Sequence, residues 1–193
     1  MPDFFKAEYN QTGNSKKTNE LGMREMQQIA FGANSAQYLL IKAPPASGKS
    51  RALMFIALEK LRNQGIKKVI VAVPERNIGA SFKATALSKD GFFADWSPKP
   101  HYNLCTSGSE KSKVQTFLEF LDSDEQILIC THATFRFACA ELDEKQLNDC
   151  LIAIDEFHHV SAEGDNRLGE VMKNIMAKSN GHIIAMTGSY FRG

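Results

Sequence analysis

The amino-acid sequence predicts a three-layer α/β/α domain with a mainly parallel central sheet, and three observations lead to this prediction. Five short apolar runs show no alternation of polar and apolar residues, which is typical of strands buried on both faces of a parallel sheet. Segments with helical apolar periodicity lie between these runs, and such alternation favours right-handed crossovers. The chain has 193 residues, 43% of them hydrophobic, so it can bury a core without disulfides or a structural metal.

The expected elements follow one another in regular order along the chain. Strands are expected at residues 38–41, 69–73, 127–130, 151–154 and 183–186, with a weaker sixth strand at 102–106. Helices are expected at 50–64, 110–121 and 166–177, and the first of them stops before Gly65, a usual residue after a helix end. Residues 1–19 are expected to form a partly flexible N-terminal segment, because 10–20 are polar and rich in Asn, Gly and Ser. Residues 20–193 are expected to form one domain.

The composition argues against several classes of protein. No apolar run approaches the roughly 20 residues needed to span a bilayer, and the N-terminus lacks the apolar region of a signal peptide. The four cysteines contain no C-x-x-C pair, so neither a zinc ribbon nor a redox motif is indicated. We therefore expect a cytoplasmic protein with reduced cysteines and no membrane partner.

The charges are unevenly distributed along the chain although the net charge is only +1. Residues 49–113 hold 12 Lys and Arg against 5 Asp and Glu, whereas residues 114–170 hold 3 against 13. This asymmetry favours a face for a polyanion, with ordinary solvated surface charge as the alternative.

The segment between the first expected strand and the first helix carries a phosphate-binding pattern. In such a P-loop, backbone N–H groups surround the β-phosphate and the helix N-terminus adds partial positive charge. Lys49, expected to face solvent, would reach the β- and γ-phosphates, and the Ser50 hydroxyl would bind Mg²⁺. The alternative is a structural turn that happens to contain G-K-S. The pattern consists of Ala43, Pro44, Pro45, Ala46, Ser47, Gly48, Lys49 and Ser50.

A pair of carboxylates follows the apolar run 151–154 directly. A buried strand that delivers Asp155 and Glu156 at its carboxyl end is the Walker B arrangement, with Asp155 holding Mg²⁺ and Glu156 orienting the attacking water. An acidic pair that merely opens a surface turn is the alternative. The adjacent His158 and His159 have no H-E-x-x-H spacing, so a zinc site is not indicated.

These motifs resemble those of superfamily 2 helicases and translocases. D-E-F-H at 155–158 is similar to their D-E-x-H box, and T-G-S-Y-F-R at 187–192 is similar to the T-G-T-P-F-R motif of restriction-type DNA translocases, the branch of the type III restriction enzyme Res subunit. The resemblance runs from about residue 20 and implies a RecA-like P-loop NTPase lobe with ATP and Mg²⁺ as cofactors. It also implies nucleic acid as partner, DNA rather than RNA, and a second RecA-like lobe in the full-length protein.

The resemblance assigns roles to further residues of this chain. M-R-E-M-Q at 23–27 is similar to the R-x-x-Q element, in which the glutamine reads adenine. Lys49, Asp155 and Glu156 are implied to be catalytic, and Ser50 and Asp155 to bind Mg²⁺. The implied nucleotide-binding set comprises Arg24, Gln27, residues 43–50, Arg51 and His158. Nucleic-acid contacts are implied for Arg76, Ser107, Gly108 and Thr131, although the interpretation of Thr131 and Thr134 as helix caps or packing residues is slightly favoured. Thr187, Gly188 and Ser189 form the implied coupling motif.

The sequence departs from the family pattern at Ala43 and Ala46, which replace glycines, and at Tyr190, which replaces a proline. The interpretation is a motor lobe that couples ATP–Mg²⁺ hydrolysis to movement on nucleic acid and that needs a second lobe for full activity. The alternatives are an ATP-binding regulatory module without turnover, an RNA helicase lobe and a small-molecule P-loop kinase. The kinase is disfavoured because it leaves the R-x-x-Q and T-G-S elements unexplained.

Overall fold

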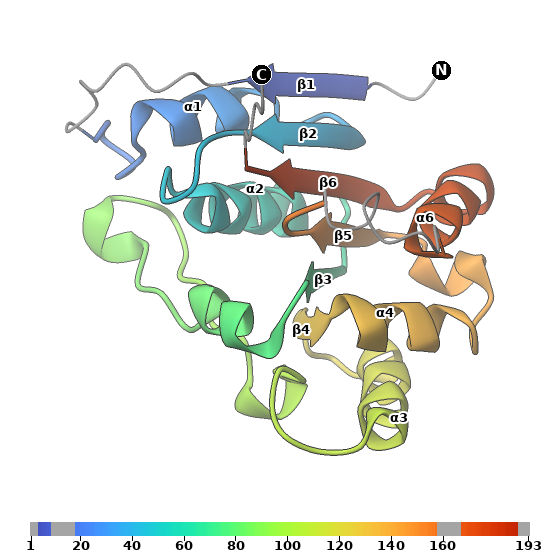
Figure 1. The fold of residues 1–193 in the computed structure, drawn as a ribbon. Coiled ribbons are helices and arrows are strands. Elements are labelled where there is room, and N and C mark those ends of the chain that lie inside the picture. Colours follow the sequence, from blue (N-terminus) through green and yellow to red (C-terminus); the bar gives the residue numbers. More distant parts are fainter. Residues whose placement is uncertain (1–3, 9–17, 158–166, 189–193) are drawn as a thin grey trace.

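The computed structural model describes residues 4–8, 18–157 and 167–188, and within them a single parallel sheet forms the centre of the molecule (Figure 1). Every strand pair is parallel, and the order across the sheet is β1-β2-β6-β5-β3-β4. The predicted α/β class and parallel sheet are therefore confirmed. The strands are β1 (Phe4–Glu8), β2 (Tyr38–Lys42), β3 (Lys68–Val73), β4 (Ile127–Thr131), β5 (Cys150–Ile154) and β6 (His182–Thr187).

Helices cover both faces of the sheet and complete three layers. The strand residues alternate between two cores: Val69 and Val71 of β3 pack on the side of α1 and α2, whereas Ile70 and Ala72 pack on the side of α3, α4 and α6. No helix of the described residues has both the length and the apolar character needed to cross a membrane. The helices are α1 (Glu25–Gly32), α2 (Lys49–Asn63), α3 (Glu110–Asp122), α4 (His132–Cys139) and α6 (Arg167–Lys178).

Five strands and three helices begin and end within one residue of the bounds expected from the sequence. The expected strand at 102–106 is wrong. Only Asn103 forms a bridge, to Ile129 of β4, and the preceding residues form a short 3-10 helix, η3 (Pro100–Tyr102). The sixth strand is instead β1, within the segment that the sequence predicted as a partly flexible N-terminus. β1 was missed because its residues Phe5, Lys6 and Glu8 are exposed, so it lacks the unbroken apolar run that marks β4 at the other edge of the sheet.

The connection between β3 and α3 is long, and Trp96 fixes it against the sheet. This tryptophan is fully buried, and its Nε1 donates a hydrogen bond to the carbonyl oxygen of Phe82 at 2.8 Å. Backbone hydrogen bonds in both directions join Thr85 to Trp96 at 2.8 and 3.0 Å. The connection contains two further 3-10 helices, η1 (Arg76–Phe82) and η2 (Ser88–Asp90). The connection between β3 and α3 therefore has a defined structure, and it packs beside α2.

Candidate nucleotide and nucleic-acid sites

The carboxyl ends of the six strands meet at one edge of the sheet because all strands run in the same direction (Figure 1). β2, β6 and β5 are consecutive neighbours, so the segments that follow them start side by side: residues 43–48, 187–188 and 155–156. β3 and β4 lie beyond β5 and bring Arg76 and Thr131 to the same edge. This edge therefore has a candidate nucleotide half and a candidate nucleic-acid half.

Residues 43–48 leave β2 as a loop with two left-handed backbone positions. Ala46 has a φ of 59° and Gly48 a φ of 91°. At Ala46 this conformation costs about 1–2 kcal/mol, a strain of the kind that gathers at functional sites. At Gly48 the positive φ disfavours any residue with a side chain, and a Cβ atom would also lie 2.5 Å from Nε2 of Gln27, so the Gln27 amide would have to move. The loop enters α2 at Lys49, and the first N–H groups of α2, around Ser50, have no partners within the helix.

Lys49 is buried, with an exposed fraction of 7%, so the expectation that it faces solvent is wrong. Its Nζ donates hydrogen bonds to the carbonyl oxygens of Ala43 at 3.0 Å and Pro44 at 3.2 Å. The same nitrogen lies 3.9 Å from Oε1 of Glu156. The loop folds around the ammonium group, which places positive charge where a phosphate would be received.

Two buried groups test whether this loop suits a triphosphate with Mg²⁺. Oγ of Ser47 is buried and has no hydrogen-bond partner among the described residues, and a phosphate oxygen would satisfy it. Asp155 is 5% exposed, and burial followed by the negative charge of Glu156 raises its pKa to about 6. A divalent cation would stabilise this carboxylate. Both groups fit ATP–Mg²⁺, and the exposed Pro45 and Ala46 leave the tip of the loop open to solvent.

The carboxylate of Glu156 lies between the loop and the end of β6. Its backbone is left-handed, with a φ of 48°, which is uncommon for a residue with a Cβ atom. Oε2 accepts a hydrogen bond from the backbone N–H of Gly188 at 3.1 Å, while Oε1 faces Lys49. The neighbouring Asp155 accepts from the Glu156 N–H at 3.0 Å through its Oδ1, and Thr187 donates to the Gly188 carbonyl at 3.2 Å. One side chain thus joins three segments that the sequence predicted as separate motifs.

His132 adds a contact between β4 and β5 that the sequence interpretation did not include. It is the first residue of α4, and its Nε2 lies 3.0 Å from the carbonyl oxygen of Asp155. The only sequence signal for this contact is a histidine that directly follows an apolar strand. The contact holds the end of the nucleic-acid half against the carboxylate pair.

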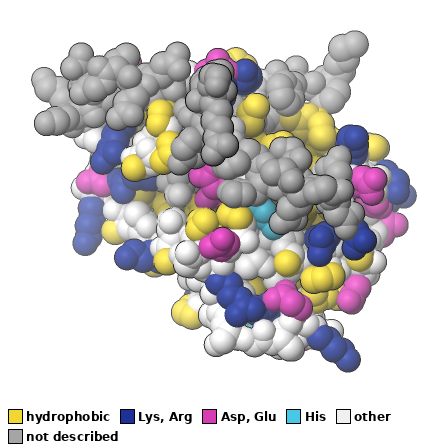
Figure 2. All heavy atoms as spheres, in the orientation of Figure 1, with side chains coloured by type: hydrophobic (Ala, Val, Ile, Leu, Met, Phe, Trp, Pro, Cys, Tyr) yellow, Lys and Arg dark blue, Asp and Glu magenta, His cyan; other side chains and the backbone are white. Residues whose placement is uncertain are grey.

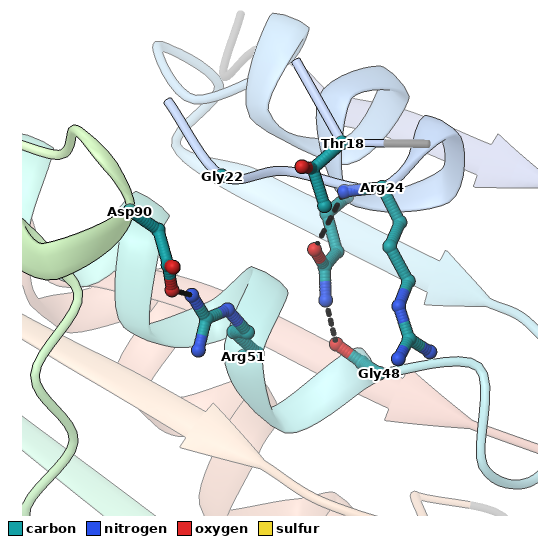
Figure 3. Close-up of a pocket in the computed structure, with 7 residues that line it drawn as sticks. Thr18, Gly22, Arg24, Gly48, Arg51 and Asp90 are labelled. Atoms are coloured by element: carbon teal, nitrogen blue, oxygen red, sulfur yellow. Dashed lines mark hydrogen bonds and ion pairs between the residues drawn. The ribbon is translucent and has the colours of Figure 1, made fainter. Parts of the chain in front are cut away.

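A pocket of about 290 Å³ opens beside the phosphate loop (Figure 3). Gln27, 1% exposed, accepts a hydrogen bond from the Arg24 N–H at 2.9 Å and donates one to the Gly48 carbonyl at 3.2 Å. Its amide has a further lone pair and a further N–H, so it keeps one acceptor and one donor site. The pocket is lined by Arg24, Gln27, Gly48 and Arg51, which the sequence assigned to nucleotide binding, and by Thr18, Gly22 and Asp90, which it did not.

In the other half, Arg76 lies close to the carboxylate of Glu110, and Thr131 is connected to the same carboxylate through Thr134. Oε1 of Glu110 lies 3.7 Å from Nη2 of Arg76 and 3.4 Å from Nζ of Lys113, and Oε2 accepts from the Thr134 hydroxyl at 2.7 Å. Burial alone would raise the pKa of Glu110, but the Thr134 hydrogen bond and both cations outweigh it and lower the pKa. Oγ1 of Thr131 accepts from the Thr134 N–H at 3.2 Å, so Thr131 caps α4. Sequence reasoning missed Glu110 because only the fold brings its partners together.

Ser107 and Gly108 are exposed in the loop before α3, in agreement with an accessible contact segment. On the face shown in Figure 2, the Lys and Arg side chains form no uninterrupted patch, and acidic side chains lie among them. Two basic residues of the segment 49–113 are paired with carboxylates, Arg76 with Glu110 and Arg51 with Asp90. His158 and Ser189, the remaining predicted site residues, lie outside the described residues.

Comparison with known proteins adds evidence independent of this geometry. A protein-family model described as DEAD/DEAH box helicase matches residues 24–192. The chain is 61% identical, over all of its 193 residues, to a Bacillus subtilis (strain 168) protein named "Putative ATP-dependent helicase YeeB". It spans 32% of the length of that protein.

Solved structures with similar folds include a helicase domain and a restriction-modification enzyme. The helicase domain of Pyrococcus furiosus Hef has a TM-score of 0.58 at 18% identity, covering 84% of this chain and 32% of that chain. The Type ISP restriction-modification enzyme LlaGI, solved with a DNA substrate mimic, has a TM-score of 0.52 at 17% identity, covering 86% of this chain and 17% of that chain. At these identities the similarity supports the RecA-like fold.

Proposed function

The chain belongs to the DEAD/DEAH box helicase family, and on this premise we propose that it is the ATP-hydrolysing motor lobe of a DNA helicase or translocase. One observation supports the proposal most strongly. The carboxylate of Glu156 lies between Nζ of Lys49, at 3.9 Å, and the N–H of Gly188, at 3.1 Å. A group that contacts both the phosphate loop and the segment after β6 is suited to report the state of the nucleotide to the rest of the chain.

The residues around this carboxylate would have different roles in binding and hydrolysing ATP–Mg²⁺. Lys49 and the N–H groups of the loop would bind the phosphates, with the unsatisfied hydroxyl of Ser47 as a further donor. Ser50 and Asp155 would hold Mg²⁺, which neutralises phosphate charge when it is bound. Glu156 would orient the attacking water and accept its proton. Gln27 and Arg24 would bind the base beside the loop.

Nucleic acid would cross the other half of the same edge. Arg76, Ser107, Gly108 and Thr131 are the proposed contacts, with Arg76 making the main phosphate contact. DNA is favoured over RNA on the strength of the T-G-S-Y-F-R motif alone, and Thr187, Gly188 and Ser189 would couple this half to the nucleotide. A second RecA-like lobe in the full-length protein would close over both halves. Competition between DNA and RNA strands of one sequence tests the preference.

The proposal is tested by replacing Lys49 and measuring ATP–Mg²⁺ binding by calorimetry. Lys49→Ala removes the ammonium group that the loop surrounds, so we expect ATP binding to be lost. Because Lys49 is buried, thermal unfolding of the variant must be measured alongside, to show that the protein is folded at the temperature of the titration. Lys67→Ala is the matched control, since Lys67 is an exposed lysine at the opposite edge of the sheet, paired with Asp149. Unchanged ATP affinity in folded Lys49→Ala protein would contradict the assignment of the phosphate loop.

A further inference from the structure

We propose that Asp90 is a positioning residue of the nucleotide pocket, which holds the guanidinium of Arg51 so that it can lie against the base of the bound nucleotide. This inference rests on the proposed function, because it assumes that the pocket beside the phosphate loop receives the base. Asp90 belongs to no recognised motif. It reaches the pocket from the long connection between β3 and α3, and Figure 3 shows its carboxylate directed at Arg51.

The backbone of Asp90 is held firmly in place. Its N–H donates to the carbonyl of Leu87 at 3.1 Å, in the 3-10 helix η2. Two close approaches fix it against the segment that leads into α1: a Cβ atom on Gly22 would lie 2.4 Å from Cβ of Asp90, and one on Gly91 would lie 2.2 Å from the carbonyl oxygen of Glu20. Both glycines also have positive φ, 74° and 100°, so the backbone conformation and the lack of space each exclude a side chain at these positions.

Aromatic packing anchors the same turn to α2. Phe92 is 4% exposed, and its ring meets the ring of Phe55 edge-on, with the centroids 4.7 Å apart. It also contacts Phe31 at the end of α1, with the centroids 6.0 Å apart. The turn that carries Asp90 is therefore packed against both helices that border the pocket, so the carboxylate has a defined position relative to α2.

Arg51 lies in the first turn of α2, one residue beyond Ser50. Nη2 of Arg51 contacts Oδ2 of Asp90 at 2.5 Å, and Cζ lies 5.4 Å from the centroid of the Phe55 ring. The guanidinium is thus held from two directions while it lines the pocket. A planar guanidinium stacks well on aromatic rings, and a purine base offers the same kind of surface. Without Asp90, the long Arg51 side chain would sample other rotamers.

Because the Arg51–Asp90 ion pair is exposed, a role in nucleotide binding can be distinguished from a role in folding stability. The Arg51 and Asp90 side chains are 31% and 52% exposed, and exposed pairs contribute little to folding stability. Loss of the pair should therefore be seen in nucleotide binding and scarcely in thermal unfolding. Charge alone predicts that loss of the Asp90 carboxylate raises ATP affinity, because removing a negative charge strengthens the attraction of the pocket for the polyanionic nucleotide.

The test measures the affinity of the 193-residue chain for ATP and for inorganic tripolyphosphate, which has the phosphates without a base. For Asp90→Asn we expect ATP affinity to fall about three- to tenfold, the scale of one cation–π contact, with tripolyphosphate affinity unchanged. Arg51→Ala should weaken ATP binding, and adding Asp90→Asn to Arg51→Ala should have no further effect, since the two residues act as one unit. Asp149→Asn, which alters the Lys67–Asp149 pair far from the pocket, is the matched control and should leave both affinities unchanged.

The outcomes that overturn the inference differ from those that overturn the proposed function. If wild-type protein binds ATP and Asp90→Asn binds it equally well or more tightly, Asp90 does not position Arg51. If Asp90→Asn weakens ATP and tripolyphosphate equally, or weakens ATP further in the Arg51→Ala background, the role assigned here is wrong. If wild-type protein binds neither ligand, the nucleotide site itself is wrong, and the inference falls with it.

Discussion

At the scale of single residues, Glu156 combines a strained backbone with a side chain that contacts two other segments of the site. The left-handed conformation at φ 48° costs about 1–2 kcal/mol for a residue with a Cβ atom. In return, the carboxylate reaches Lys49 on one side and Gly188 on the other. Local sequence patterns predicted this residue and the phosphate loop because each motif is contiguous. They could not predict Asp90, Glu110 or His132, because the partners Arg51, Arg76 and Asp155 of these residues lie on other elements.

Replacement of this carboxylate should separate binding from hydrolysis. Glu156→Gln keeps an acceptor for the Gly188 N–H and the shape of the side chain, so we expect ATP–Mg²⁺ affinity to be retained within about threefold, less than the effect of one hydrogen bond to a charged group. Hydrolysis should fall by about 10²–10⁴, because an amide cannot accept a proton from water. Phosphate release by the two-lobe protein measures the second effect, and calorimetry the first. Residual turnover close to wild type would assign the proton acceptor elsewhere.

At the scale of elements, a buried polar cluster joins the end of α2 to the start of β6. Lys60 is fully buried, and its Nζ contacts the Ala36 carbonyl at 2.9 Å, Oε1 of Gln64 at 3.1 Å and Nδ1 of His182 at 2.8 Å. Burial lowers the pKa of Lys60 to about 8. Burial, followed by the charge of Lys60, lowers the pKa of His182 to about 4. Between about pH 4 and pH 8 a charged Lys60 therefore donates to a neutral imidazole.

This cluster predicts a specific loss of stability in acid. Between pH 6.5 and pH 4 the unfolded chain binds a proton at His182 that the folded protein does not, so the free energy of unfolding falls as the pH is lowered. His182→Asn keeps an acceptor near Nδ1 without the titration. We expect the stability difference between wild type and variant to change by about 1–2 kcal/mol across this range, after allowance for partial exposure. Urea unfolding at several pH values measures it, and parallel pH profiles of the two proteins would contradict the prediction.

The elements also show which parts of the fold the sequence could predict. Strands such as β3 and β5 are buried on both faces, so their apolar runs are unbroken and their bounds are predictable. β1 has one hydrogen-bonded neighbour and exposed Lys6 and Glu8, so no apolar run marks it. The helices α1 and α4 have only eight residues each, too few for a clear apolar period. Residues 102–106 have an apolar centre, yet only Asn103 and Leu104 reach β4.

At the scale of the whole molecule, the strand order separates the two proposed halves of the carboxyl edge of the sheet. β2, β6 and β5 carry the proposed nucleotide half, and β3 and β4 carry the proposed nucleic-acid half. Contacts such as that of His132 with the Asp155 carbonyl, at 3.0 Å, are the physical link between them. Each half has exposed loop residues, Pro45 and Ala46 in one and Ser107 and Gly108 in the other, and we propose that a second lobe covers them.

We therefore expect this chain alone to be a poor ATPase and a weak binder of nucleic acid. It presents Lys49, Asp155 and Glu156 without a cation from a facing lobe, and loss of such an arginine finger lowers turnover by about 10³–10⁵ in related P-loop enzymes. Phosphate release by the chain should remain near background with or without DNA, and should rise when the second lobe is joined to it. DNA binding should weaken steeply with salt, by a slope of about 0.7 for each phosphate contact to a single strand. Strong DNA-stimulated turnover by the chain alone would contradict the two-lobe proposal.

The pairing of β2 with β6 also has a consequence for the time course of synthesis on the ribosome. Residues 38–42 pair with residues 183–187, so the inner edge of β2 has no partner until almost all of this chain has emerged. At translation rates of about 5–20 residues per second, this delay is on the order of 10 s. During that time β2 presents an unpaired strand edge, which invites association with other nascent chains. The phosphate loop at residues 43–48 is made early, whereas Gly188, which contacts Glu156, follows about 140 residues later, so this contact forms only after β6 has been made.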